Sequence, residues 1–187
     1  KDEPQILQAL VDRYGTKIEV RGGKRYFNVH GPTAELRPVF YDVEAKVEWM
    51  DRVGMDVAGI SVAPPIFFYG LSPEIGLEAA RLANDGIAQM VAQRPDRLRG
   101  LAHLPMQDPD AAITELERVV KEHEFKGIEM GTSIENDPLA HPKFRKVLKA
   151  IEQSGCFIFT HPYHCLARGE ILEDYYLSNF VGFPLDT

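Results

Sequence analysis

The chain has 187 residues, of which 44% are hydrophobic, so it is long enough to bury one sizeable core. Its 28 acidic residues outnumber its 21 basic residues and give a net charge of −7. The basic residues form no long cluster, so we expect neither nucleic acid nor a membrane surface as a partner. No stretch approaches the roughly 18 uninterrupted apolar residues of a membrane span. The two cysteines, Cys156 and Cys165, indicate no disulfide scaffold, and we expect a cytoplasmic protein.

The two ends of the sequence look like the ends of a segment. It begins at Lys1 instead of methionine, and residues 184–187 have no helix pattern. We therefore expect a piece of a longer protein. Within residues 1–41 the sequence predicts a short helix after Pro4 and a hairpin whose turn is Arg21-Gly22-Gly23-Lys24. We expect residues 1–41 to form an excursion that decorates a core built from residues 42–187.

From Asp42 onward, helix-patterned segments alternate with short buried strands. The helices begin at Asp42, at Ser72-Pro73, at Asp108-Pro109 and at Pro142, and the strands begin near residues 57, 98, 127 and 156. None of these strands alternates polar with apolar residues. That pattern predicts a parallel sheet covered by helices.

Two architectures contain such a sheet, a doubly wound open sheet and a (β/α)8 barrel. No Gly-x-Gly-x-x-Gly or phosphate loop follows any strand, which argues against the first. Each strand ends in a polar or proline-marked loop, and in a barrel these loops share the face that carries active sites. Because a whole barrel takes about 250 residues, we predict that this chain covers the first half to two-thirds of a (β/α)8 barrel.

His161 stands where the last predicted strand stops, and Pro162 holds it extended. An imidazole at the end of a buried parallel strand is placed for chemistry, although a histidine that only satisfies its hydrogen bonds fits these residues equally well. His103, on the second strand, could also face the site. We expect His123 to be solvated at a helix end and His141 to cap a helix.

Other groups give weaker signals. His161 and His164 do not share a face of a strand, and Cys165 lacks a third group that would orient a catalytic pair. Glu129 could act as a general base. The aromatic run Phe67-Phe68-Tyr69 predicts either simple loop packing or an aromatic wall for a planar substrate.

Ordered motifs along residues 42–187 resemble the decarboxylases of the amidohydrolase superfamily. They are Met50–Asp56, Pro65–Tyr69, Gly100–Gln107, Gly127–Thr132, Phe159–Pro162 and Val181–Pro184. The resemblance implies a (β/α)8 barrel with one divalent metal, usually zinc. It makes His161 the metal ligand on the fifth strand. It also implies a His-x-His pair before Lys1, and a catalytic histidine and a last aspartate ligand after Thr187.

The resemblance further implies a metal-dependent, non-oxidative decarboxylase of an unsaturated or aromatic carboxylic acid, acting as a homodimer or larger homo-oligomer. It places Phe67, Phe68, Tyr163 and Asn28 in the substrate pocket. Members carry an arginine near Asn28 and tryptophans near residues 163 and 179–180, which this chain lacks. These changes lie where substrate is chosen, and a resorcylate- or carboxyvanillate-like acid is a candidate.

Three further expectations complete this interpretation. No lysine lies in residues 127–132, so we expect no binuclear centre with a carbamylated lysine. A hydrolase or hydratase of the same superfamily is an alternative, because a metal-activated water also attacks carbonyls and alkenes. A non-catalytic barrel fragment that acts only in assembly is the alternative from a different class.

Overall fold

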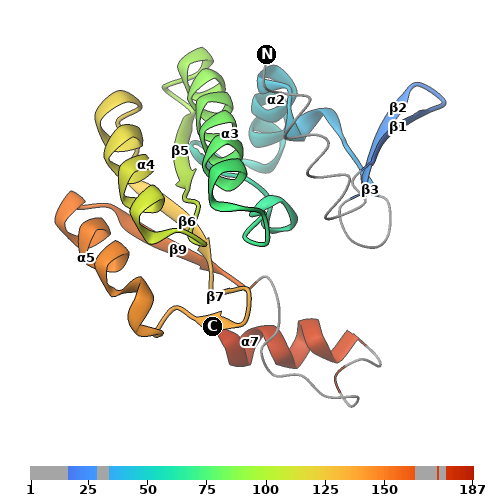
Figure 1. Cartoon of the computed structure of the whole chain (residues 1–187). Coiled ribbons are helices and arrows are strands. Elements are labelled where there is room, and N and C mark those ends of the chain that lie inside the picture. Colours follow the sequence, from blue (N-terminus) through green and yellow to red (C-terminus); the bar gives the residue numbers. More distant parts are fainter. Residues whose placement is uncertain (1–16, 29–33, 163–171, 173–175) are drawn as a thin grey trace.

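The computed structural model describes residues 17–28, 34–162, 172 and 176–187 (Figure 1). Its centre is a parallel four-stranded sheet in the order β4-β5-β6-β9, so that the strand order follows the chain order. The strands are β4 (Ala58–Ile60), β5 (Leu98–His103), β6 (Gly127–Gly131) and β9 (Phe157–His161). The predicted parallel sheet is confirmed.

Four helices cover one side of this sheet (Figure 1). They are α2 (Val43–Val53), α3 (Pro73–Gln93), α4 (Pro109–Glu122) and α5 (Arg145–Ser154). Their ends follow from local chemistry. Asp42 and Asp108 each accept a hydrogen bond from a backbone N–H of the first helical turn, and Gly54 and Gly155 end helices in the left-handed conformation. The fourth predicted helix begins with a separate 3-10 turn, η3 (Pro142–Phe144).

Side chains alternate between the two faces of the sheet. The even-numbered residues of β4, β5 and β6, such as Ala102 and Ile128, are buried beneath the helices. The strand registers pair His103 with Glu129, Glu129 with Phe159, and Gly131 with His161. These odd-numbered residues therefore share the opposite face, which we call the inner face because it lines the lumen of a closed barrel.

The inner face is open at β9. Phe157 and Phe159 are 57% and 49% exposed, and in the part of the chain that the structure describes β9 pairs only with β6. Large apolar side chains that cover a barrel lumen would be buried by neighbouring strands. The exposure of β9 is therefore the pattern expected of a barrel of which only part is described.

A second, antiparallel sheet precedes α2 in the chain and projects away from the parallel sheet (Figure 1). It contains β1 (Lys17–Arg21), β2 (Lys24–Asn28) and β3 (Ala34–Glu35), and leads through η1 (Pro38–Phe40) into α2. The β1–β2 turn is the predicted one, because Gly22 and Gly23 have φ values of +57° and +77° that favour glycine. The helix predicted after Pro4 lies outside the described residues.

Two features were not predicted. A small hairpin, β7 (Ser133–Ile134) and β8 (Asp137–Pro138), follows β6. The chain also ends in a π-helical turn, η5 (Ser178–Gly182), followed by α7 (Phe183–Asp186), so the absence of a terminal helix was a wrong prediction. Gly182 and Pro184 are poor helix formers and hide this helix in the sequence. No described helix is both long and apolar enough to cross a bilayer.

Candidate active site at the carboxyl ends of the strands

His161 lies at the carboxyl end of β9 on the inner face, partly buried. Its Nδ1 is 2.8 Å from the carbonyl oxygen of Pro162. Because a carbonyl oxygen only accepts, Nδ1 carries the ring proton and Nε2 of the neutral ring keeps its lone pair. In histidines that bind a metal through one ring nitrogen, a hydrogen bond of this kind from the other ring nitrogen orients the ring. The geometry thus leaves Nε2 as a metal-binding atom.

Glu129 lies on the same face, on the neighbouring strand β6. Its carboxyl group is buried and forms a side-chain hydrogen bond with Ser61, which follows β4. Burial raises the pKa of Glu129, while the hydrogen bond with Ser61 and the positive charge that His161 carries when it is protonated act in the opposite direction. Side chains from β6, from β9 and from the end of β4 therefore interact at one place.

His103 is next to Glu129 in the strand register and is only 3% exposed. Its Nε2 donates to the carbonyl oxygen of Phe67 over 2.9 Å, and its ring stacks on the Phe67 ring with 5.1 Å between centroids. Burial lowers the pKa of His103 to about 4, so the ring is neutral near pH 7. His103 is on the inner face but lies beneath the loop that carries Phe67, so that it faces the site stays a prediction.

Unpaired buried polar atoms mark this end of the sheet. Among the described residues, four buried side-chain atoms have no hydrogen-bond partner: His103 Nδ1, Gln107 Oε1, Glu129 Oε2 and Thr132 Oγ1. All four belong to β5, to β6 or to the few residues that follow these strands. Buried polar groups are nearly always paired, and exceptions need an explanation. Their position at the carboxyl end of a barrel sheet indicates a site for a polar ligand.

The predicted pocket residues take different positions. Phe67 and Phe68 are buried in the loop after β4, and Asn28 lies partly buried at the end of β2. The hydroxyl of Tyr69 accepts a hydrogen bond from the backbone N–H of Gly131 over 3.1 Å, so this loop packs directly over the end of β6. Tyr163 lies outside the described residues. Which of these side chains contacts substrate stays a prediction.

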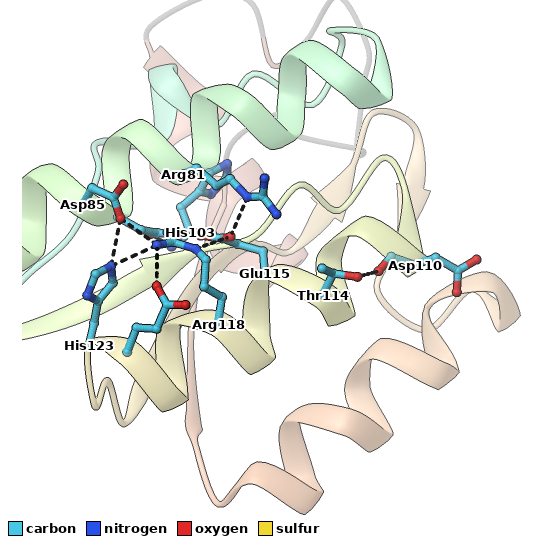
Figure 2. A network of polar contacts seen from close by, with 10 residues as sticks. Arg81, Asp85, His103, Asp110, Thr114, Glu115, Arg118 and His123 are labelled. Carbon is cyan, nitrogen blue, oxygen red and sulfur yellow. Dashed lines mark hydrogen bonds and ion pairs between the residues drawn. The ribbon is translucent and has the colours of Figure 1, made fainter.

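Two further described histidines, His123 and His141, do not lie on the strands of the parallel sheet. His123 was predicted to be solvated, but its Nε2 is 2.8 Å from Asp85 Oδ1, within an ion-pair network between α3 and α4 (Figure 2). The prediction was wrong because α3 packs against the end of α4 and supplies the carboxylate. His141 accepts a hydrogen bond from the backbone N–H of Lys143 over 3.3 Å, so the predicted capping role is confirmed. His164 and Cys165 lie outside the described residues.

Sequence reasoning did not single out Ser61, and it included Thr132 only as part of the polar loop after the third predicted strand. A period-two count would have identified Ser61, because it is two residues beyond Gly59 and therefore on the inner face. Thr132 carries no such signal, since it lies just past the end of β6.

The described residues fit one part of a metal site. His161 Nε2 and Glu129 Oε2 both lack a protein hydrogen bond in this part of the chain and come from adjacent strands. No group of three or more histidine, cysteine, aspartate or glutamate side chains among the described residues could hold an ion. A metal site at His161, which needs three or four ligands, would therefore require residues beyond the described ones.

Comparisons with known proteins agree with this geometry. A sequence model described as Amidohydrolase matches residues 21–184. The 2-amino-3-carboxymuconate-6-semialdehyde decarboxylase of Dictyostelium discoideum is 31% identical over 147 residues, which are 79% of this chain and 41% of that protein. The gamma-resorcylate decarboxylase of Polaromonas sp. is 43% identical over 94 residues, which are 50% of this chain and 29% of that protein.

Solved structures give the same result. The crystal structure of 5-carboxyvanillate decarboxylase from Sphingomonas paucimobilis matches with a TM-score of 0.70 and 31% identity, over 76% of this chain and 43% of that one. A dihydroxybenzoic acid decarboxylase from Polaromonas sp. JS666, with bound manganese and the inhibitor 2-nitroresorcinol, matches with a TM-score of 0.67 and 28% identity, over 76% of this chain and 46% of that one. The chain spans less than half the length of these relatives. It belongs to the amidohydrolase family, and its parallel sheet is part of the predicted (β/α)8 barrel.

Proposed function

We propose that the protein is a metal-dependent, non-oxidative decarboxylase of an unsaturated or aromatic carboxylic acid. The observation that carries this proposal is the pair of unpaired buried polar atoms, Glu129 Oε2 and Thr132 Oγ1, on β6 and just after it, next to the strand end that carries His161. Relatives with the same fold are named for the decarboxylation of carboxymuconate, resorcylate and carboxyvanillate compounds.

The proposed cofactor is one divalent metal, held in part by His161 through Nε2. Its remaining ligands would come from residues outside the described part of the chain. A bound ion of this kind supplies Lewis acidity and lowers the pKa of coordinated water. Imidazole suits zinc, our expected ion, whereas manganese is the metal named for the Polaromonas structure. Metal analysis of the purified protein decides between them.

The residues of this chain would bind and orient the acid. A substrate carboxylate is repelled by an acidic protein and by ionised Glu129, so it needs a cation at His161 to approach. Glu129 keeps a proton to a higher pH than an ordinary glutamate, and in that form its carboxyl group can donate a hydrogen bond. The buried aromatic residues of the loop after β4 keep water from this part of the inner face.

Several finer points belong to the proposal. Phe67, Phe68, Asn28 and Tyr163 would form the substrate pocket, with Phe67 and Phe68 on one side. The protein would act on a small carboxylate in the cytoplasm as a homodimer or larger homo-oligomer. Replacement of the usual tryptophans by Tyr163, Asn179 and Phe180 favours an aromatic acid of the resorcylate or carboxyvanillate type as substrate.

The test is an assay of the whole protein, with every residue its gene encodes, on a panel of 2,6-dihydroxybenzoate, 5-carboxyvanillate and an aminocarboxymuconate semialdehyde. We expect carbon dioxide release from at least one acid, loss of activity after chelation, and recovery with zinc or manganese. Ester or amide hydrolysis without carbon dioxide would support the hydrolase instead. A protein that retains no metal and turns over nothing would support the non-catalytic alternative.

A further inference from the structure

A side chain from α3 binds the end of β5, beyond the point where the neighbouring strand β4 ends. β4 ends at Ile60, which pairs with Gly100, so no β4 residue stands opposite His103. Asn84 of α3 takes that place: its Oδ1 accepts from the His103 N–H over 2.8 Å, and its Nδ2 donates to the His103 carbonyl over 2.9 Å. A buried amide on a helix thus fixes the backbone of His103 as a strand would.

The loop after β4 occupies the space above this strand end, and it is attached at successive residues. His103 Nε2 donates to the carbonyl oxygen of Phe67, and the Tyr69 hydroxyl accepts from the Gly131 N–H. Between them, Gln107 Nε2 lies 3.5 Å from the carbonyl oxygen of Phe68. We call residues 64–71 the β4–α3 loop. Its attachments come from β5, from the turn after β5 and from β6.

Ring contacts strengthen the attachment. The imidazole of His103 lies nearly parallel to Phe67, at 6°, and tilted at 32° to Tyr69, with centroids 5.1 and 5.5 Å away. Phe67 and Tyr69 are 1% and 2% exposed. His103 is thus enclosed by two aromatic rings, with its one proton directed at the loop backbone. A group so enclosed cannot itself touch substrate without movement of the loop.

Phe68 connects the loop to the N-terminal sheet. It has a φ of +52°, a conformation that side chains other than glycine rarely adopt and that packing must hold in place. Phe68 packs in a small apolar cluster with Leu71, Ile75 and Phe27 of β2. Phe27 precedes Asn28 in the sequence, so the position of the loop also determines where the end of β2 lies.

We propose that His103 is a positioning residue that fixes the β4–α3 loop as a rigid wall of the substrate site, with the N-terminal sheet seated on that wall through Phe68. The inference rests on the proposed decarboxylase function, because it assigns this wall to the same site. A fixed aromatic wall selects flat substrates, so the favoured class is planar aromatic carboxylates over flexible aliphatic ones.

The test compares three variants of the whole, metal-loaded protein. His103→Phe keeps a stacking ring but removes the donor to Phe67, His103→Gln keeps a donor without the ring, and Tyr69→Phe removes the acceptor for Gly131. Hydrogen exchange of the backbone amides of residues 67–71, measured by mass spectrometry, reports the loop without any need for turnover. The amides of α5, on another part of the sheet, provide the internal control.

We expect loop exchange roughly tenfold faster in His103→Phe and Tyr69→Phe, the loss produced by one buried hydrogen bond. Exchange in α5 should not change, and His103→Gln should restore part of the protection. For a planar acid such as 2,6-dihydroxybenzoate, KM should rise about tenfold in His103→Phe while kcat changes much less.

Unchanged loop exchange in both His103→Phe and Tyr69→Phe would overturn the proposal. So would equal acceleration in the loop and in α5, which would make His103 a general stability residue. If His103→Phe does not fold, His103→Gln decides in its place, because it loses the ring contacts with Phe67 and Tyr69, and loop exchange equal to that of the wild type would overturn the proposal. If the wild-type protein turns over no acid, the proposed function fails, while the exchange data still decide whether His103 fixes the loop.

Discussion

Two clusters of buried polar groups lie on opposite sides of β5, and they differ in how completely they are paired. On the helix side, Glu115 is fully buried between α3 and α4 (Figure 2). Arg118 donates to both of its carboxylate oxygens, over 2.8 and 2.9 Å, and Asn84 donates to one of them over 2.7 Å. On the inner face, Glu129 is also buried, but its Oε2 has no partner among the described residues.

The difference in pairing between Glu115 and Glu129 indicates different roles for the two clusters. The carboxylate of Glu115 raises the pKa of the Arg118 guanidinium, so each charge of the pair stabilises the other. Burial raises the pKa of Glu129 instead, because the hydrogen bond with Ser61 and the interaction with His161 offset its lost hydration only in part. Asn84 belongs to both regions, since it also holds the backbone of His103. The helix-side cluster connects the sheet to its helices, whereas the inner-face cluster belongs to the site that we propose for a ligand.

The largest effect should follow from breaking the paired cluster. Glu115→Ala leaves the partly buried Arg118 without its main partner, although Asp85 and Glu122 still contact it. We expect the free energy of unfolding to fall by about 3 kcal/mol, the lower end of the range for a broken buried pair. Glu35→Ala, which removes the exposed partner of Lys24, is the control and should cost less than about 1 kcal/mol. Urea denaturation of both variants measures the two effects. Equal losses would mean that the paired cluster adds nothing beyond a surface ion pair.

A smaller effect should appear as acid sensitivity caused by His103. The pKa of His103 is about 4 in the folded chain, whereas an ordinary histidine, as in the unfolded chain, has a pKa of 6.5. As the pH falls below 6.5, the unfolded chain therefore binds a proton before the folded chain does. Stability should therefore decrease between pH 6.5 and pH 4, by up to about 3 kcal/mol at 1.36 kcal/mol per pKa unit. His103→Gln removes this loss. Urea denaturation at pH 7 and pH 4.5 measures it, and parallel pH dependence in both proteins would contradict the assignment.

The smallest effect is expected from Glu129→Gln, which we compare with the same substitution at Glu115. Glu129→Gln removes a charge that the fold does not favour, so in metal-free protein at pH 7 stability should change by less than about 1 kcal/mol. Because the pKa of Glu129 is raised in the folded chain, the contribution of its protonated form to folding stability is fully present below pH 4.5 and is lost as the pH rises through the raised pKa. Glu129→Gln lacks this loss, so it should become more stable relative to the wild type as the pH rises. Glu115→Gln is the matched control, and thermal unfolding should show it to be clearly less stable. Equal destabilisation by both substitutions would remove the distinction between the clusters.

Local sequence signals predicted the scaffold. Asp42, Asp108, Gly54 and Gly155 set helix ends through interactions within a few residues, which a single sequence displays. The strand that stops at His161 was found in the same way. The terminal helix was missed because its residues have low helix propensity and the π-helical turn precedes Pro184.

The site depended on contacts that no local pattern contains. The interaction of Glu129 with Ser61 and His161 follows from the register of separate strands. The placement of His123 beside Asp85 needs the packing of α3 on α4, across 38 positions of sequence. The hydrogen bond from His103 to Phe67 depends on how a proline-containing loop folds back over β5. Contacts between residues so far apart in the sequence leave no periodic pattern, so only the structure reveals these contacts.

The central claim is that His161 holds a metal at the carboxyl ends of the strands, and metal content tests it most directly. Plasma emission spectrometry of the whole purified protein should give about one divalent ion per chain for the wild type. The same value is expected for His141→Ala, which removes an exposed capping histidine, while His161→Ala should lose most of the metal and remain folded by circular dichroism. An unchanged metal content in His161→Ala would contradict the account.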